Sequence, residues 1–185
     1  MRIIGGAHRG RALASVGKGD AAAHLRPTSD RVRESLFNIL AGYDVIDGAR
    51  VLDLFAGTGA LGLEALSRGA EFVSFVENGR KSQAILAQNI ALCRAEDDVQ
   101  VFRSDARRLG VNSWAGYDLV FLDPPYGAGL GEVALASALA GGWLTDEALV
   151  VWEESAEITP PEALELIDVR RYGDTVISLL QRGGA

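Results

Sequence analysis

The sequence predicts a doubly wound α/β fold, in which helices cover both faces of a mostly parallel β-sheet. Apolar runs of strand length alternate with segments of helical periodicity, and these runs are apolar throughout rather than at every second position. Continuous apolar strands are typical of parallel sheets that are buried on both faces. The last two runs are separated only by residues 172–174, which suits an antiparallel hairpin and leaves no room for a crossover helix.

The first 27 residues precede this pattern, and we expect them to form a basic N-terminal arm of short strands and turns. This small β and helical extension would join a domain formed by residues 28–185. After Pro27, Thr28 or Ser29 can cap a helix that Gly42 ends. The apolar positions of this helix lie at helical spacing: Val32, Leu36, Ile39 and Leu40.

The remaining elements follow in strict order along the chain. Helical patterns occupy residues 60–68, 80–93 and 130–140. Apolar strand-like runs occupy residues 51–55, 72–76, 99–102, 119–122, 148–152, 164–171 and 175–181. The predicted architecture is therefore a doubly wound sheet that ends in an antiparallel pair, an ending that is unusual for a dehydrogenase.

The charge is distributed unevenly over the 185 residues. Residues 1–33 hold seven basic and two acidic side chains, a net charge of +5, while the whole chain carries −7, so that the remainder carries −12. Such asymmetry is consistent with a basic arm on an acidic body, although a merely solvated terminal segment explains it equally well.

Composition excludes several classes of protein. No apolar stretch approaches the roughly 20 residues that a membrane span needs, and the first residues lack the apolar core of a secretory signal. The single cysteine, Cys93, excludes an internal disulfide framework and a cysteine-rich zinc site. Cys93 shares an apolar helical face with Leu86 and Ile90, so we expect a core residue rather than a nucleophile. We expect a soluble, cytoplasmic monomer without a metal.

Polar residues follow the first three predicted strands, where ligands bind in an open α/β sheet. Asp53 ends the first strand and precedes Phe55 and a glycine-rich turn, in which Thr58 lies between Gly57 and Gly59. These glycines let the backbone approach a ligand closely at a helix N-terminus. The other candidate cofactor-binding residues follow the second and third strands: Glu77, Asn78, Asp105 and Ala106.

This pattern favours S-adenosylmethionine over a dinucleotide. The spacing of Gly57, Gly59 and Gly62 also fits the dinucleotide fingerprint, and Glu77 lies 20 residues beyond Gly57, where it can accept hydrogen bonds from ribose hydroxyls. However, a carboxylate at Asp53 suits a zwitterionic amino acid and repels a diphosphate. A purely structural role for Asp53 in the loop is the alternative.

The fourth strand ends at Asp123-Pro124-Pro125-Tyr126, which we interpret as the reaction centre. Neither proline offers an N–H group to a central strand, so the backbone leaves the sheet in a rigid, extended conformation. The Asp123 carboxylate and the Pro124 carbonyl can accept the two N–H bonds of an exocyclic amine and free its conjugated lone pair for attack on a methyl group. The Tyr126 ring offers a surface on which a flipped base can stack.

The sequence also resembles a known family, the bacterial 16S ribosomal RNA guanine-N2 methyltransferases of class I. Matching segments are MRIIGG at 1–6 with RGR at 9–11, LRPTSDRVRESLFNIL at 25–40, VLDLFAGTG at 51–59 and DPPY at 123–126. The segment at 25–40 is the most specific, because the others occur in many methyltransferases. The acidic composition, with a pI near 4.9, departs from the more basic surface common in the family.

The resemblance implies a seven-stranded sheet with a reversed last strand, S-adenosylmethionine as the donor, and a guanine of the small ribosomal subunit as the acceptor, of the guanine-966 type. It implies the assembled or assembling subunit, rather than naked RNA, as the partner. It also places Thr28, Arg31 and Arg33 near the cofactor or the target base. The basic residues expected to contact RNA are Arg2, Arg9, Arg11, Arg26 and Arg31.

Other functions remain open on the sequence alone. A DNA adenine-N6 or a protein glutamine-N5 methyltransferase can use the same tetrapeptide, although glutamine enzymes usually have Asn at the position of Asp123 and DNA enzymes usually carry a recognition domain. An NAD-dependent oxidoreductase would explain the glycines but not the tetrapeptide. A non-catalytic RNA-binding module would explain only the basic arm.

Overall fold

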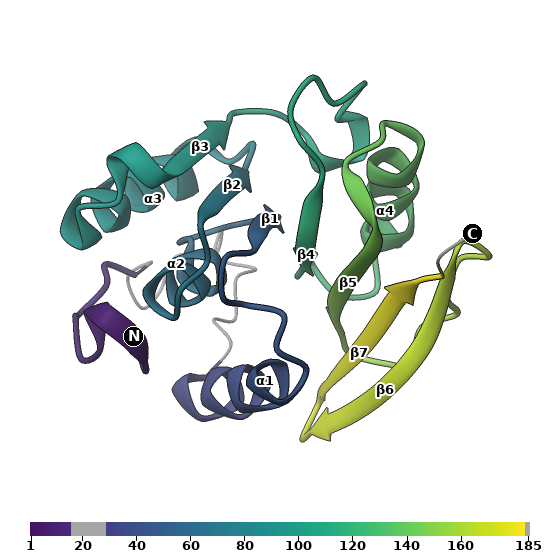
Figure 1. The fold of residues 1–185 in the computed structure, drawn as a ribbon, viewed down its shortest axis with the longest axis horizontal. Coiled ribbons are helices and arrows are strands. Elements are labelled where there is room, and N and C mark those ends of the chain that lie inside the picture. The colour runs from purple at the N-terminus through teal and green to yellow at the C-terminus, as the bar shows by residue number, and fades with distance from the viewer. Residues whose placement is uncertain (16–28, 184–185) are drawn as a thin grey trace.

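The computed structural model describes residues 1–15 and 29–183 (Figure 1). Its sheet has seven strands in the order β3-β2-β1-β4-β5-β7-β6. The strands are β1 (Arg50–Leu54), β2 (Phe72–Val76), β3 (Val99–Phe102), β4 (Tyr117–Leu122), β5 (Leu144–Glu154), β6 (Leu164–Tyr172) and β7 (Thr175–Arg182). The pairs among β1 to β5 are parallel, and β7 runs antiparallel to both of its neighbours. The predicted fold class is confirmed.

Helices cover both faces of this sheet. Helices α1 (Asp30–Gly42), α2 (Ala60–Ser67) and α3 (Arg80–Cys93) pack on one face, and α4 (Leu130–Ala140) packs on the other. Short 3₁₀ turns complete the described elements at η1 (Gly6–His8), η2 (Glu96–Asp98) and η3 (Ala106–Arg108). Cys93 is buried among the side chains of the first face, as the sequence predicted.

The chain order reverses between β1 and β4, because β2 and β3 lie on one side of β1 while β4 and β5 lie on the other. Ligands of open α/β sheets bind at such a reversal, outside the carboxyl ends of the strands. Asp53 of β1 pairs in register with Phe121 of β4, so that Asp123 follows two residues later along the same edge. The fold therefore brings the predicted cofactor loop and the predicted reaction centre together.

The described part of the N-terminal arm, residues 1–15, is docked on α2. The backbone N–H groups of Ile4 and Gly5 donate to the buried carboxylate of Glu64 at 2.8 and 2.9 Å. A Cβ atom at Gly6, where φ is +75°, would lie 1.7 Å from the carbonyl oxygen of Ser67, so this contact requires glycine. In place of the short strands expected here, the described residues contain one isolated bridge between Arg2 and Ala12.

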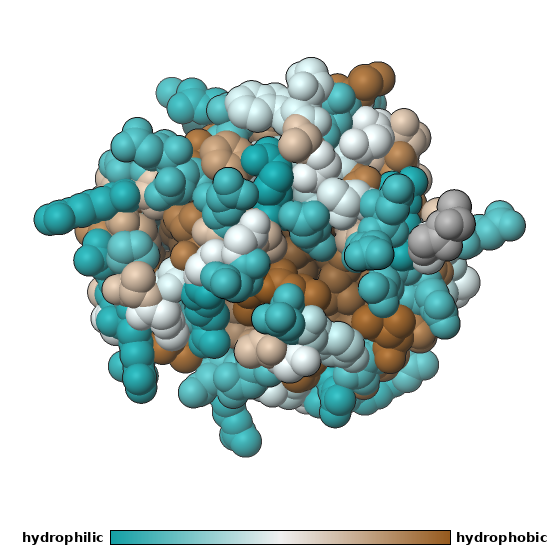
Figure 2. Space-filling view, viewed as in Figure 1, coloured by the Kyte–Doolittle hydropathy of each residue, from teal (hydrophilic) through white to brown (hydrophobic). Residues whose placement is uncertain are grey.

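Strand β5 begins earlier than its apolar run predicted. Leu144 already pairs with Tyr117, and the register then shifts so that Leu119 pairs with Leu149. The polar residues Thr145, Asp146 and Glu147 lie in this irregular stretch, which is why the apolar pattern did not reveal it. Polar side chains cover most of the viewed face of the molecule, and apolar side chains gather between them toward its middle (Figure 2).

Candidate active site

The loop after β1 has the backbone conformation of a tight ligand-binding turn. Phe55, Gly57 and Gly59 have φ angles of +60°, +56° and +78°. Left-handed conformations are unfavourable for a residue such as Phe55 and cluster at functional sites. A Cβ atom at Gly62 would lie 2.4 Å from the Phe75 ring, so this glycine allows α2 to pack closely on β2. The loop and the first turn of α2 are thereby fixed.

Glu77 anchors this loop from the end of β2. Its Oε2 accepts a hydrogen bond from Gly57 N at 2.8 Å, and its Oε1 accepts one from Gly79 N at 2.6 Å. Each carboxylate oxygen retains a second lone pair that can accept a ligand hydroxyl. The side chain is half-buried, whereas Asn78 is exposed. Thr58 is held by a side chain of α3, because its carbonyl accepts a hydrogen bond from the buried Asn89 amide at 2.8 Å.

Two carboxyl groups at the reversal of the sheet have raised pKa values. Asp53 is buried and accepts from Gly62 N at 3.0 Å. Burial, with a smaller contribution from the charge of Glu77, raises the pKa of Asp53 to about 7. Desolvation raises the pKa of Asp123 well above its ordinary value, and the negative charges of Glu153, Asp53 and Glu154 raise it further. This excess of carboxyl groups favours a cationic ligand and opposes a diphosphate.

The Asp-Pro-Pro-Tyr segment is tied to the ends of β5 and β7. The Tyr126 hydroxyl donates to Glu153 Oε1 at 2.5 Å and lies 3.3 Å from Thr175 Oγ1. Gly127 N donates to Glu154 Oε1 at 3.2 Å. Desolvation and the hydrogen bond to Glu153 raise the pKa of Tyr126, so this tyrosine is a neutral donor.

The exposure of these residues differs along the segment. Pro124 is buried and Pro125 is exposed, and Asp123 retains part of its surface. Tyr126 is 38% exposed, which leaves part of its ring available to a ligand while its hydroxyl is fixed. Glu153 is buried, with 4% of its surface exposed. Sequence reasoning missed Glu153 and Glu154, although their place at the end of an apolar strand could have indicated them.

After β3, Asp105 forms a local structure. Its carboxylate caps η3 by accepting from Arg107 N at 3.0 Å and pairs with the Arg107 guanidinium at 2.6 Å. The hydrogen bond from the Arg107 side chain contributes most to lowering the pKa of Asp105. Ala106 is buried beneath the turn. Asp105 is thus ionised at the edge of the sheet, where the sequence predicted a cofactor-binding residue.

The predicted site residue Arg33 lies elsewhere. Its guanidinium is 1% exposed on α1, where it bonds Asp30 at 3.0 Å and the carbonyl of Arg2, and lies 3.8 Å from Glu64. Its described contacts hold α1, α2 and the N-terminus together and include none of the carboxylates at the end of β1 or β4. The predicted site residues Arg26 and Thr28 lie outside the described residues.

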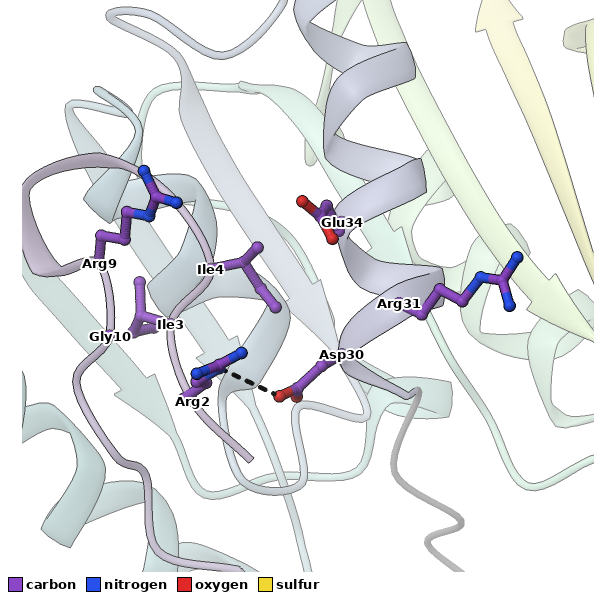
Figure 3. Close-up of a pocket in the computed structure, with 8 residues that line it drawn as sticks. All are labelled: Arg2, Ile3, Ile4, Arg9, Gly10, Asp30, Arg31 and Glu34. Carbon is purple, nitrogen blue, oxygen red and sulfur yellow. Dashed lines mark ion pairs between the residues drawn. The ribbon is translucent and has the colours of Figure 1, made fainter.

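Arg2, Arg9 and Arg31 line a cavity of about 380 Å³ between the N-terminal segment and α1 (Figure 3). Arg2 lies 3.7 Å from Asp30. Arg11 lies apart from this cavity lining and donates to the Leu92 carbonyl in the last turn of α3. The structure therefore gathers three of the five predicted RNA-contacting arginines around one cavity.

Comparisons with known proteins agree with this geometry. The family model described as "Conserved hypothetical protein 95" matches residues 1–181. The ribosomal RNA small subunit methyltransferase D of Escherichia coli is 43% identical over 85% of this chain and 76% of its own length. The protein of the same name from Haemophilus influenzae is 36% identical over 98% of this chain and 93% of its own length. The chain belongs to this methyltransferase family.

Solved structures extend the comparison to the whole fold. The Escherichia coli protein yhhF has a TM-score of 0.84 at 41% identity and covers 100% of this chain, with 99% of its own chain covered. The family resemblance expected from the sequence is confirmed, as is methyltransferase activity as the enzyme class.

The described residues include neither a membrane-spanning helix nor a metal-binding group of side chains. None of their helices is long and apolar enough to cross a membrane. Within residues 1–15 and 29–183, no three His, Cys, Asp or Glu side chains are grouped so as to hold a metal ion.

Proposed function

We propose that this methyltransferase uses S-adenosylmethionine to methylate the exocyclic N2 of a guanine in the 16S ribosomal RNA of the small subunit, in the cytoplasm. The observation that carries the proposal is the position of Asp123-Pro124-Pro125-Tyr126 at the reversal of the sheet, on the same edge as Asp53 and the glycine-rich loop after β1. The names of the two relatives, which are small-subunit ribosomal RNA methyltransferases, support the acceptor.

The residues at the carboxyl ends of β1 to β3 fit this cofactor. S-adenosylmethionine supplies an activated methyl group on a sulfonium, and it carries positive charge where a dinucleotide carries a diphosphate. Burial raises the pKa values of Asp53 and Asp123 most, and neighbouring carboxyl groups raise them further, so a bound cation would stabilise the ionised forms of both. The residues proposed to hold the cofactor are Thr28, Asp53, Phe55, Gly57, Thr58, Gly59, Glu77, Asn78, Asp105, Ala106 and Asp123; Arg33, expected from the sequence to join them, is buried against α2 and the N-terminal segment instead.

Asp123 and Pro124 are proposed to receive the amino group of the base. Their carboxylate and carbonyl oxygens would accept its two N–H bonds, which directs the nitrogen lone pair toward the methyl group. Displacement then depends on alignment more than on strong base catalysis. The proton of the methylated nitrogen can leave to Asp123 or to water. Tyr126 would hold the ring of the flipped base, because its hydroxyl is fixed and part of its surface is exposed.

The partner is proposed to be the RNA of an assembled or assembling subunit, bound through arginines of the N-terminal region. Arg2, Arg9 and Arg31 surround one cavity, and Arg11 lies nearby in sequence; Arg26 completes the proposed set. Since the net charge of the chain is −7, electrostatic binding would be local to this surface rather than spread over the molecule.

Mass-spectrometric mapping of 16S ribosomal RNA tests the proposal. Small subunits from a strain that lacks the enzyme are incubated with the purified chain and S-adenosylmethionine, and naked 16S ribosomal RNA is treated in parallel. We expect one new N2-methylguanine in the subunits and less in naked RNA. Methylation of another base, or of a ribosomal protein instead of RNA, would refute the proposed acceptor.

A further inference from the structure

A second cavity lies next to the reaction centre, between α1 and the turn that joins β6 to β7. We call it the hairpin cavity; its volume is about 420 Å³, and it is lined by Arg31, Val32, Ser35, Tyr172 and Gly173. This volume is within the range of small-molecule sites. Figure 1 shows the tip of the β6–β7 hairpin beside α1, and the hydroxyls of Ser35 and Tyr172 join the two elements at 2.7 Å.

The hairpin cavity is connected to the reaction centre by one pair of residues. Tyr172 pairs with Thr175 across the turn. The hydroxyl of Thr175 lies 3.3 Å from the hydroxyl of Tyr126. A nucleic-acid strand that places a base against Tyr126 therefore has this cavity as a neighbouring site.

The charge of the hairpin cavity favours an anion. Arg31 is the single charged residue among its described lining residues, and its guanidinium forms no ion pair with another described residue. The cavity at the N-terminal segment differs, because Asp30 and Glu34 offset its arginines. Arg31 lines both cavities, and in Figure 3 its side chain projects from α1 away from Arg2 and Arg9.

We propose that the hairpin cavity binds the nucleotide next to the target base in a single RNA strand, with Arg31 at its phosphate and Tyr172 at its base. This inference rests on the proposed function. An arginine without an ion pair to another described residue supplies the phosphate contact, and a tyrosine ring supplies a stacking surface that accepts any base. From there the strand continues past Arg31 to the cavity at the N-terminal segment, where Arg9 also forms no ion pair with a described residue.

Photocrosslinking tests what occupies the cavity. Tyr172→p-benzoylphenylalanine keeps an aromatic side chain on this wall, and the variant is irradiated with small subunits from a strain that lacks the enzyme. We expect crosslinks to 16S ribosomal RNA close to the methylated guanine. Crosslinks to a ribosomal protein alone, or none to RNA, would overturn the inference.

Kinetics with the same subunits test the contribution of the cavity. Arg31→Gln should raise KM about tenfold, leave kcat and the affinity for S-adenosylhomocysteine within about twofold, and lower the salt dependence of binding by about one ion. Tyr172→Leu should raise KM similarly, while Tyr172→Phe, which keeps the ring, should not. Arg94→Gln is the matched control, since this exposed arginine lines neither cavity.

The outcomes separate the two proposals. If the wild-type chain methylates the subunits and Arg31→Gln has an unchanged KM, the hairpin cavity is not an RNA site, but the proposed function stands. If the wild-type chain transfers no methyl group to the subunits, the proposed function fails and this inference fails with it.

Discussion

At the scale of single residues, Tyr126 shows how the structure refines a sequence motif. The sequence indicates a ring that can stack on a base. The structure adds a buried acceptor for its hydroxyl, Glu153 at 2.5 Å, and a second contact with Thr175. A ring held at both its backbone and its hydroxyl presents one orientation to a substrate, which lowers the entropy lost when the base binds.

Tyr126→Phe should therefore slow methyl transfer about tenfold while leaving the affinity for S-adenosylhomocysteine unchanged, since a hydrogen bond to a charged group is worth about 1.5–3 kcal/mol. Single-turnover methylation of small subunits measures the rate, and calorimetry measures the affinity. In a Glu153→Met background the Tyr126 hydroxyl has lost this acceptor, so Tyr126→Phe should leave the rate of methyl transfer almost unchanged. Equal losses in both backgrounds would show that the hydrogen bond is not what orients Tyr126.

The raised pKa of Asp53 predicts that the stability of the folded chain depends on pH. Its pKa in the folded chain is about 7 against an ordinary value of 3.8, so between these values the folded state holds a proton that the unfolded state has lost. Its stabilising contribution is thus complete below the ordinary value and disappears as the pH rises through about 7.

Asp53→Asn removes this dependence. The unfolding free energy of the wild type, measured by urea without cofactor, should fall relative to that of Asp53→Asn between about pH 5 and about pH 8, by a few kcal/mol at most. An unchanged difference between the two proteins across this range would show that Asp53 is ionised throughout. A cationic cofactor should bind the wild type more tightly as the pH rises through the same range.

At the scale of elements, the N-terminal segment and α1 are joined to α2 by one buried carboxylate. Glu64 is fully buried, accepts from Ile4 N and Gly5 N, and pairs with Arg68 at 2.7 Å. Arg33, also buried, lies 3.8 Å from the same carboxylate. Glu64 thus neutralises a buried arginine and satisfies two backbone donors at once.

Glu64→Gln should lower the unfolding free energy by about 3–5 kcal/mol, because Arg33 and Arg68 lose a buried charged partner and two backbone N–H groups lose a charged acceptor. Urea unfolding measures the loss, and hydrogen exchange of residues 1–15 should increase at the same time. Glu71→Gln, which changes an exposed carboxylate, is the control and should stay within about 0.5 kcal/mol. A loss in Glu64→Gln no larger than in this control would contradict the role of Glu64.

The helices and strands were predictable from the sequence where the pattern of apolar residues alone determines them. The strands buried on both faces and the helices α1 to α4 follow from continuous or periodic apolar residues. The early start of β5 at Leu144 was not predictable, because polar residues occupy its irregular stretch. Glu64, Ser67 and Asn89 all bind the backbone of residues 1–15, and the helical pattern of α2 gave no sign that Glu64 is buried.

At the scale of the whole molecule, the reversal of the strand order decides which residues meet. The sequence indicates Asp53 and Asp123 separately, as residues that end strands, and the sheet places them on the same edge. Glu153 and Thr175 complete the surroundings of Tyr126 from β5 and β7. The contact of these residues with Tyr126 could not be predicted, since it depends on the long-range order of the strands.

The uneven charge distribution of the sequence can be interpreted only when the fold is known. Within the described part of the arm, Arg2 and Arg9 line a cavity together with Arg31 of α1, and the backbone of Ile4 is bound to α2. The acidic residues include those that raise the pKa of Asp123. An acidic protein can thus present a local basic surface to RNA and an acidic site to a cationic cofactor.

Asp123 is proposed to act mainly on the acceptor amine and to contribute little to the affinity for the cofactor. The most direct measurement is single-turnover transfer of labelled methyl groups from S-adenosylmethionine to unmethylated small subunits, by the wild type and by Asp123→Ala, with calorimetry of S-adenosylhomocysteine binding. Asp123→Ala should transfer methyl groups about 10²–10³ times more slowly and bind S-adenosylhomocysteine within a few-fold of the wild type. Near-normal transfer by Asp123→Ala would contradict the account.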